Sequence, residues 1–186
     1  MIIGLTGKNA AGKGESAKYL QSKEFICFSL SDILREKATE KGLDHRRETL
    51  IALGNKFRQK DPAFLAIETN NKIAQAREKI PESDIVIDSV RSPAEVKELE
   101  TNKDFMLIGI DAPIEMRFER MKKRQRQGDA ETLDDFRKQE ELENTDDSKA
   151  QQIGNTLILI DVLIINDGTI EELHRKLYKI LEVYHQ

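Results

Sequence analysis

MIIGLTGKNAAGKGES, residues 1–16, is the stretch of sequence from which the fold can be predicted. Residues 2–5 form a short apolar run that is typical of a buried strand. Gly7–Lys13 then matches the G-x-x-x-x-G-K frame of a phosphate-binding loop, and a helical pattern follows it. Such a loop needs glycine where backbone N–H groups converge on an anion, and the helix adds its positive N-terminal end. The stretch therefore predicts a P-loop that binds nucleotide phosphates.

The loop and the first helical turn are expected to hold ATP through Gly7, Asn9, Ala10, Ala11, Gly12, Lys13, Gly14 and Glu15. Lys13 would bring a mobile positive charge to the outer phosphates, which makes it a candidate catalytic residue. The usual frame ends in Ser or Thr, whose hydroxyl binds Mg²⁺, whereas Gly14 stands at that position here. Whether Glu15 or Ser16 approaches the metal ion stays open at this stage.

The composition favours one cytoplasmic domain, residues 1–186, that handles small molecules. A net charge of −4 argues against general affinity for nucleic acid or for an anionic membrane. The single cysteine, Cys27, cannot form an internal disulfide, which favours a reducing compartment. No signal peptide is recognised, and the longest apolar run, Ile153–Ile165, is too short to span a bilayer. The oligomeric state is left open between monomer and homodimer.

Short apolar segments alternate with segments of helical period along the whole chain. Because the strand candidates are apolar on both faces, we predict an α/β fold of the P-loop NTPase type, with a five-stranded parallel sheet and helices on both faces. The predicted strands are 2–5, 25–28, 84–88, 105–110 and 162–166. The predicted helices are 15–22, 33–41, 46–59, 63–80, 93–99, 113–124, 133–142 and 170–184, with a further, ambiguous helix within 148–160.

Ligands of such sheets bind at the carboxyl ends of the strands, and charged residues follow the second and third predicted strands there. Asp88 ends the third strand at the Walker-B position, where a carboxylate can hold Mg²⁺ through water; the alternative is a carboxylate that caps the next turn. Arg35 and Arg91 offer planar forks that match phosphate oxygens. Together with Asp32 they predict a site for the acceptor substrate.

Two further groups of residues are candidates for nucleotide binding. Asn166, Asp167 and Gly168 form a turn after the fifth strand, where backbone groups could meet the base of ATP, and Gly168 is expected to have a positive φ. The densest basic patch comprises Arg117, Arg120, Lys122, Lys123, Arg124 and Arg126. We interpret it as a segment that brings arginines, Arg120 and Arg124 first, over the transferring phosphates. Glu140, Glu141 and Glu143 are interpreted as a solvated face.

Several of these stretches resemble known kinases. S-L-S-D-I-L-R at Ser29–Arg35 resembles the S-T-G-D-x-L-R segment of adenylate kinases, in which the arginine binds the monophosphate acceptor. I-D-S-V-R at Ile87–Arg91 is similar to their D-G-F-P-R, with Ser89 in place of Gly and without the Pro. F-E-R-M-K-K-R at Phe118–Arg124 resembles their R-x-x-x-R before the lid.

Other stretches extend the resemblance to the end of the chain. I-N-D-G-T-I-E-E-L at Ile165–Leu173 resembles the N-D-G segment of dephospho-CoA kinases. V-R-S-P-A-E-V at Val90–Val96 is similar to archaeal-type adenylate-kinase-like ATPases. The resemblance as a whole is to the nucleoside monophosphate kinase branch of P-loop proteins. It implies an acceptor-binding (NMP-binding) helical segment at 33–80 and a lid-like segment at 117–143.

The residues and the resemblance together predict an ATP- and Mg²⁺-dependent kinase of a nucleoside or deoxynucleoside monophosphate. In this hypothesis Asp32, Arg35 and Arg91 hold the acceptor. One alternative is dephospho-CoA kinase, whose acceptor is a hydroxyl, so that Asp32 would serve as a catalytic base. A second alternative, from a different class, is a nucleotide-binding regulator that hydrolyses ATP slowly or not at all. Phosphoryl transfer, as opposed to hydrolysis alone, separates these classes.

Overall fold

One parallel sheet organises the molecule, which we describe from a computed structural model covering residues 1–125, 129–143, 147 and 151–184. The strands are β1 (Ile2–Thr6), β2 (Ile26–Ser29), β3 (Ile85–Asp88), β4 (Phe105–Asp111) and β5 (Val162–Ile165), in the order β2-β3-β1-β4-β5. β1 lies in the centre, where Ile2 pairs with Ile85 on one side and with Phe105 on the other. The predicted five-stranded parallel sheet is confirmed.

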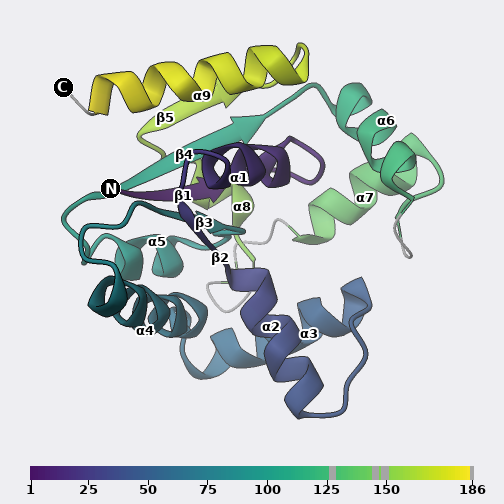
Figure 1. Cartoon of the computed structure of the whole chain (residues 1–186). Helices are drawn as coiled ribbons and strands as arrows, with labels where there is room; N and C mark the ends of the chain where they lie inside the picture. The colour runs from purple at the N-terminus through teal and green to yellow at the C-terminus, as the bar shows by residue number, and fades with distance from the viewer. Residues whose placement is uncertain (126–128, 144–146, 148–150, 185–186) are drawn as a thin grey trace.

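Helices cover both faces of the sheet (Figure 1). The helices are α1 (Lys13–Gln21), α2 (Leu30–Glu40), α3 (Arg47–Lys60), α4 (Phe64–Lys79), α5 (Pro93–Leu99), α6 (Ile114–Arg124), α7 (Leu133–Glu143), α8 (Ile153–Leu157) and α9 (Ile170–Tyr184). α1 and α9 lie together on one face, whereas α4 and α5 lie on the other. α2 and α3 project at one side and α6 and α7 at another. That 33–80 binds the acceptor and that 117–143 acts as a lid stay predictions.

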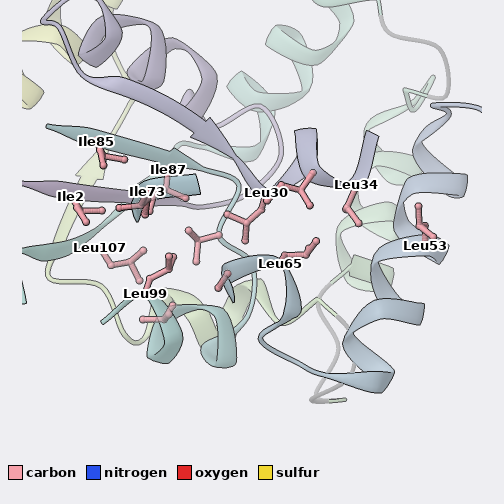
Figure 2. Close-up of a cluster of buried hydrophobic side chains, with 14 of the residues drawn as sticks. Ile2, Leu30, Leu34, Leu53, Leu65, Ile73, Ile85, Ile87, Leu99 and Leu107 are labelled. Carbon is pink, nitrogen blue, oxygen red and sulfur yellow. The ribbon is translucent and has the colours of Figure 1, made fainter. Parts of the chain in front are cut away.

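Alternate residues of the central strands pack into two separate hydrophobic cores, because successive side chains of a strand point to opposite faces. Ile2, Ile85 and Ile87 pack with Leu30, Leu65, Ile73 and Leu99 from the helices of one face (Figure 2). On the opposite face, Ile3, Leu5 and Val86 pack with Leu20, Leu173 and Leu177 of α1 and α9. Each such side chain contributes roughly 1.5–3 kcal/mol on burial, so the sheet is fixed from both sides.

The predicted element boundaries hold within a few residues, with one exception that bears on the site. α2 begins at Leu30, directly after β2, rather than at residue 33. Asp32 therefore lies in the first turn of the helix, where a carboxylate is favourable. α5 begins at Pro93 as expected, and its N-cap is Ser92, whose Oγ accepts a hydrogen bond from the Glu95 N–H at 3.3 Å. Over the described ranges, none of the helices has the length and apolar character that a membrane span requires.

Candidate active site

The P-loop turns from β1 into α1 through a backbone that only small residues tolerate. Gly7 has φ +138° and Gly12 has φ +119°, both in the region that favours glycine. A Cβ at Gly7 would lie 2.0 Å from the carbonyl oxygen of Ile110, and one at Gly12 would lie 2.4 Å from Nδ2 of Asn166. Ala10 also adopts a left-handed conformation, with φ +58°. The loop is therefore pressed between the end of β4 and the turn after β5.

Lys13 lies at the mouth of this loop. Its Nζ donates hydrogen bonds to the carbonyl oxygens of Gly7 (2.7 Å) and Lys8 (2.8 Å). These bonds hold the ammonium group beside the loop whose N–H groups are expected to bind phosphate. The position suits a charge that contacts the outer phosphates of a nucleotide.

The side chains of Glu15 and Ser16 contact different parts of the protein. The Glu15 carboxylate lies 3.3 Å from Nε2 of His174 on α9, and the His174 ring stacks on Tyr19 with centroids 4.4 Å apart. The Ser16 hydroxyl is fully buried and donates to the Gly12 carbonyl at 3.1 Å. Both side chains are thus engaged with the protein, one with α9 and the other with the backbone of the loop. Gly14 is exposed, and a Cβ there would meet nothing within 4 Å.

Asn166, which directly follows β5, holds the P-loop in place through its side chain. Its buried side chain donates from Nδ2 to the carbonyl of Ala11 at 2.8 Å, and its N–H donates to the Asp111 carbonyl at 2.7 Å. Arg120 completes the arrangement, because its Nη2 donates to the Asn166 carbonyl at 3.0 Å. Arg120 is thereby tied to the turn after β5. Its Nη1 is buried without a hydrogen-bond partner among the described residues, and burial lowers the pKa of this guanidinium.

The expected positive φ of Gly168 is wrong. A side chain at this position would instead collide with Glu172, since a Cβ would lie 1.7 Å from its Oε2. That carboxylate accepts a hydrogen bond from the Thr169 N–H at 3.0 Å, and Thr169 Oγ1 accepts one from the Glu172 N–H at 3.3 Å. The two residues form a capping box at the start of α9. Gly168 is needed because this box lies against it.

A cavity of about 580 Å³ opens beside the P-loop and joins segments that are far apart in the sequence. Gly7, Asn9 and Lys13 line it from the loop. Its charged lining comprises the cations Lys13, Arg35, Arg46, Arg47, Arg91 and Arg124 and the acids Asp44 and Asp129. Its apolar lining comprises Leu34, Leu50, Ile51 and Ile153. The cavity is therefore suited to a ligand with an anionic end and an apolar body, although the whole chain has a net charge of −4.

Three of the predicted arginines lie together at this cavity. Arg35 Nη1 forms an ion pair with Oδ1 of Asp32 at 2.5 Å, but Asp32 itself does not line the cavity. Arg91 donates from Nη1 to Oε1 of Gln151 at 3.1 Å. Arg124 donates from Nε (3.2 Å) and Nη2 (2.7 Å) to the Asp129 carboxylate. Arg120, by contrast, is not part of the lining.

Asp88, the predicted ligand of a magnesium ion through water, does not line the cavity. It ends β3, next to the central strand that leads into the P-loop. Its Oδ1 is buried and has no hydrogen-bond partner within the described part of the chain. Among the same residues no cluster of three or more His, Cys, Asp or Glu side chains could hold a metal by itself. A role of Asp88 in holding Mg²⁺ together with phosphates and water stays a prediction.

Arg117 of the basic patch has a structural role that the sequence did not reveal. Its side chain is only 2% exposed and donates from Nε to the Ala112 carbonyl (2.9 Å) and from Nη1 to the Asn9 carbonyl (3.3 Å). It also forms an ion pair with Glu140 of α7. The interpretation of Glu140 as part of a solvated face is wrong, because this buried pair joins α6 and α7 to the P-loop. Arg126 lies outside the described residues.

Several cavity residues were not predicted from the sequence. Asp44, His45 and Arg46 lie in the connection from α2 to α3, Arg47 is the first residue of α3, and Asp129 and Gln151 lie on either side of α7 in the sequence. Asp44 accepts hydrogen bonds from the Arg46 guanidinium, the Thr49 hydroxyl and the Arg46 N–H, which lower the pKa of Asp44 to about 2. The one available signal was the run of charges D-H-R-R at the start of a predicted helix.

The comparisons with known proteins show the family of this chain. A UPF0200 protein of Pyrococcus horikoshii is 32% identical over 97% of this chain and 96% of its own length. One from Sulfurisphaera tokodaii is 34% identical over 97% of this chain and 96% of its own length. The chain belongs to the UPF0200 family. It also belongs to the family described as AAA domain, which matches residues 3–147.

Solved structures similar to this UPF0200 chain show the fold. A protein of Thermus thermophilus superimposes with a TM-score of 0.63 and 18% identity, covering 98% of this chain and 96% of the other. Shikimate kinase from Aquifex aeolicus gives a TM-score of 0.56 and 16% identity over the same shares. The α/β P-loop NTPase fold predicted from residues 1–16 is confirmed, and its structural neighbours include kinases. A specific relation to adenylate kinases stays a prediction.

Proposed function

We propose that this UPF0200 protein transfers the γ-phosphoryl group of ATP to a nucleoside or deoxynucleoside monophosphate, with Mg²⁺ as cofactor. One observation carries the proposal. The cavity that contains Lys13 of the P-loop also contains Arg35, Arg91 and Arg124, which come from three other parts of the chain. Phosphoryl transfer depends mainly on positioning and on charge stabilisation, and this lining provides both.

The acceptor end of the cavity favours a phosphate over a bare hydroxyl. A hydroxyl acceptor, as in dephospho-CoA kinase or shikimate kinase, benefits from a carboxylate base with a pKa near the working pH. Asp44 lines the cavity, but its pKa is lowered to about 2 by Arg46 and Thr49, so it is a poor base. Asp129 is paired with Arg124, and Asp32 lies outside the lining. A monophosphate needs no base, because its oxygen is already negatively charged.

In the proposed reaction an oxygen of the acceptor phosphate attacks the γ-phosphorus of ATP. The bond between that phosphorus and the β–γ bridging oxygen breaks, and ADP leaves. Lys13 contacts the outer phosphates, Arg35 and Arg91 hold the acceptor phosphate, and Arg124 adds positive charge as the group moves. Mg²⁺, bound through water to Asp88, would neutralise charge on the β- and γ-phosphates.

The bases of the two nucleotides are proposed to bind at different places, the acceptor base inside the cavity and the adenine of ATP outside its lining. Leu34, Leu50 and Ile51 offer an apolar surface to the base of the acceptor. The turn at Asn166–Gly168, together with Arg120, is the proposed site of the adenine of ATP. A structure with a bound ATP analogue in which adenine lies away from this turn would contradict that assignment.

The experiment that tests the function supplies the purified protein with ATP, Mg²⁺ and each member of a panel. The panel contains the common ribo- and deoxyribonucleoside monophosphates, dephospho-CoA and shikimate, and both ADP release and phosphorylated product are measured. Stoichiometric formation of a nucleoside diphosphate supports the proposal. ADP release without any phosphorylated product favours a hydrolysing regulator, and a product from dephospho-CoA or shikimate alone overturns the assignment of the acceptor.

A further inference from the structure

A fully buried ion pair joins α3 to α5 outside the cavity lining. Arg58, near the end of α3, donates from Nε (3.1 Å) and Nη2 (2.7 Å) to Oε1 of Glu95 in the first turn of α5. The side chains are 1% and 0% exposed. Gly54, one turn earlier on α3, makes room for the pair, because a Cβ there would lie 3.0 Å from Arg58 Nη1. Two charges have thus been removed from water at a point that lies outside the cavity lining.

The second oxygen of the Glu95 carboxylate connects this pair to the site. Oε2 accepts a hydrogen bond from the backbone N–H of Arg91 at 2.7 Å. The Arg91 carbonyl accepts a hydrogen bond from the Gln152 N–H at 2.9 Å, and its side chain reaches Gln151. The main chain of Arg91 is therefore held on one side by Glu95. Through Glu95 it is joined to Arg58 on α3.

α3 also reaches the cavity directly. Arg47, Leu50 and Ile51 line it from the first half of the helix, whereas Arg58 lies in the last turns. A shift of α3 that accommodates an acceptor would displace Arg58, and the Glu95 carboxylate would transmit this displacement to the Arg91 N–H.

We propose that Glu95 is a positioning residue that couples α3 to Arg91. When α3, which lines the cavity with Arg47, Leu50 and Ile51, shifts around an acceptor, the phosphate-binding Arg91 shifts with it. The inference rests on the proposed function, because it takes Arg91 to be a contact of the acceptor phosphate. A merely structural role would not require charges. Buried ion pairs are often replaced by apolar residues of similar volume without loss of stability, whereas loss of one partner alone is strongly destabilising.

This difference provides the test. Arg58→Met leaves Glu95 buried and unpaired, and we expect a Tm lowered by roughly 6–20 °C. The double variant Arg58→Met/Glu95→Leu replaces the pair by apolar side chains and is expected to recover most of that loss. It still lacks an acceptor for the Arg91 N–H. Arg77→Met is the matched control, because it removes the arginine of a half-exposed ion pair with Asp104, outside the cavity lining.

Two readouts separate positioning from stability. Calorimetry with the best monophosphate of the panel should show binding about 10- to 100-fold weaker in the double variant, the range for a lost charge-assisted hydrogen bond. Binding of adenosine 5′-(β,γ-imido)triphosphate should stay within about twofold of the unmodified protein. A double variant that recovers its Tm and binds the monophosphate normally overturns the proposal. So does a variant that loses both ligands equally.

Amide hydrogen exchange tests the coupling without any substrate. In Arg58→Met the Arg91 N–H should exchange at least about tenfold faster, although Arg58 does not touch it. Unchanged exchange at Arg91 overturns the coupling even where an acceptor has been found. If the panel yields no acceptor, the proposed function fails while the exchange result still stands.

Should the double variant not fold, Glu95→Gln replaces it in the binding measurements. The two carboxylate oxygens of Glu95 accept from Arg58 and from Arg91, whereas a glutamine has a single oxygen and would turn its NH2 group toward one of these donors.

Discussion

At the scale of single residues, the proposed chemistry depends first on Lys13. Replacing Lys13 by Ala removes a positive charge at the mouth of the P-loop while its backbone stays in α1. We expect the transition state to lose about 2.7–4 kcal/mol, a fall of about 10²- to 10³-fold in kcat, with little change in Tm. Lys18→Ala, an exposed lysine of the same helix, is the control. Turnover by Lys13→Ala at the level of this control would show that the loop is not the catalytic phosphate site.

Arg35 and Arg124 line the same cavity but are expected to act on different steps. Arg35→Ala should weaken binding of the acceptor by about 10- to 100-fold, or roughly 1.5–3 kcal/mol, and leave affinity for an ATP analogue nearly unchanged. Arg124→Ala should lower kcat more than it raises the KM of either substrate, because its charge matters most during transfer. Titration of both variants with each ligand measures the difference. Loss of ATP binding in Arg35→Ala would show that the acceptor site has been assigned to the wrong side of the sheet.

At the scale of elements, the contact between α6 and α7 depends on a charge that the sequence had suggested to be solvated. Glu140→Gln leaves the 2% exposed Arg117 guanidinium without its carboxylate partner. Because Asp111 still lies 3.7 Å from Arg117 Nε, we expect a loss of about 3 kcal/mol, at the low end for a broken buried pair. Urea denaturation measures it, with the exposed neighbour Glu141→Gln as control. Equal stability of the two variants would mean that the pair does not hold the helices.

The start of α3 should respond to acid. The pKa of Asp44 is about 2 in the folded protein, chiefly through hydrogen bonds from Arg46 and Thr49, against about 3.9 in an unfolded chain. A lowered pKa stabilises the folded state above pH ~4, and this contribution is lost as the pH falls toward 2. The first turn of α3 should lose amide protection over that interval. In Asp44→Asn the protection should already be low at pH 7, and a pH profile like that of the unmodified protein would contradict the assignment.

The elements themselves were predictable because their signals are local. Apolar runs and helical periods are contained within each segment, and the glycines of the P-loop lie within eight residues of one another. The buried charges were not predictable. Arg58 meets Glu95 and Arg117 meets Glu140 only after distant segments have packed, and alone each looks like an ordinary surface charge. The part of the cavity lining at Asp44–Arg47 was missed for the same reason. This segment comes close to the P-loop only in the folded chain, and no local sequence signal shows it.

At the scale of the whole molecule, charge is distributed unevenly. The chain has a net charge of −4, yet six cations and two acids line the cavity. A phosphorylated acceptor is therefore attracted locally, and the attraction should be screened by salt. We expect the KM of the acceptor to rise steadily between about 0.05 and 0.5 M NaCl, with a smaller change in kcat. A KM independent of salt would indicate that these cations do not face the bound acceptor.

The central position of β1 has a consequence for how the protein is made. β1 is synthesised before its two neighbours, which begin at Ile85 and Phe105, so it cannot enter the sheet until those segments have left the ribosome. At the usual 5–20 residues per second, this apolar strand and the loop after it remain unpaired for roughly 4–20 s. During that time the nascent chain presents a hydrophobic segment to the cell. A chaperone that binds short apolar stretches would find a target in β1 during this interval, in the strand that later leads into the P-loop.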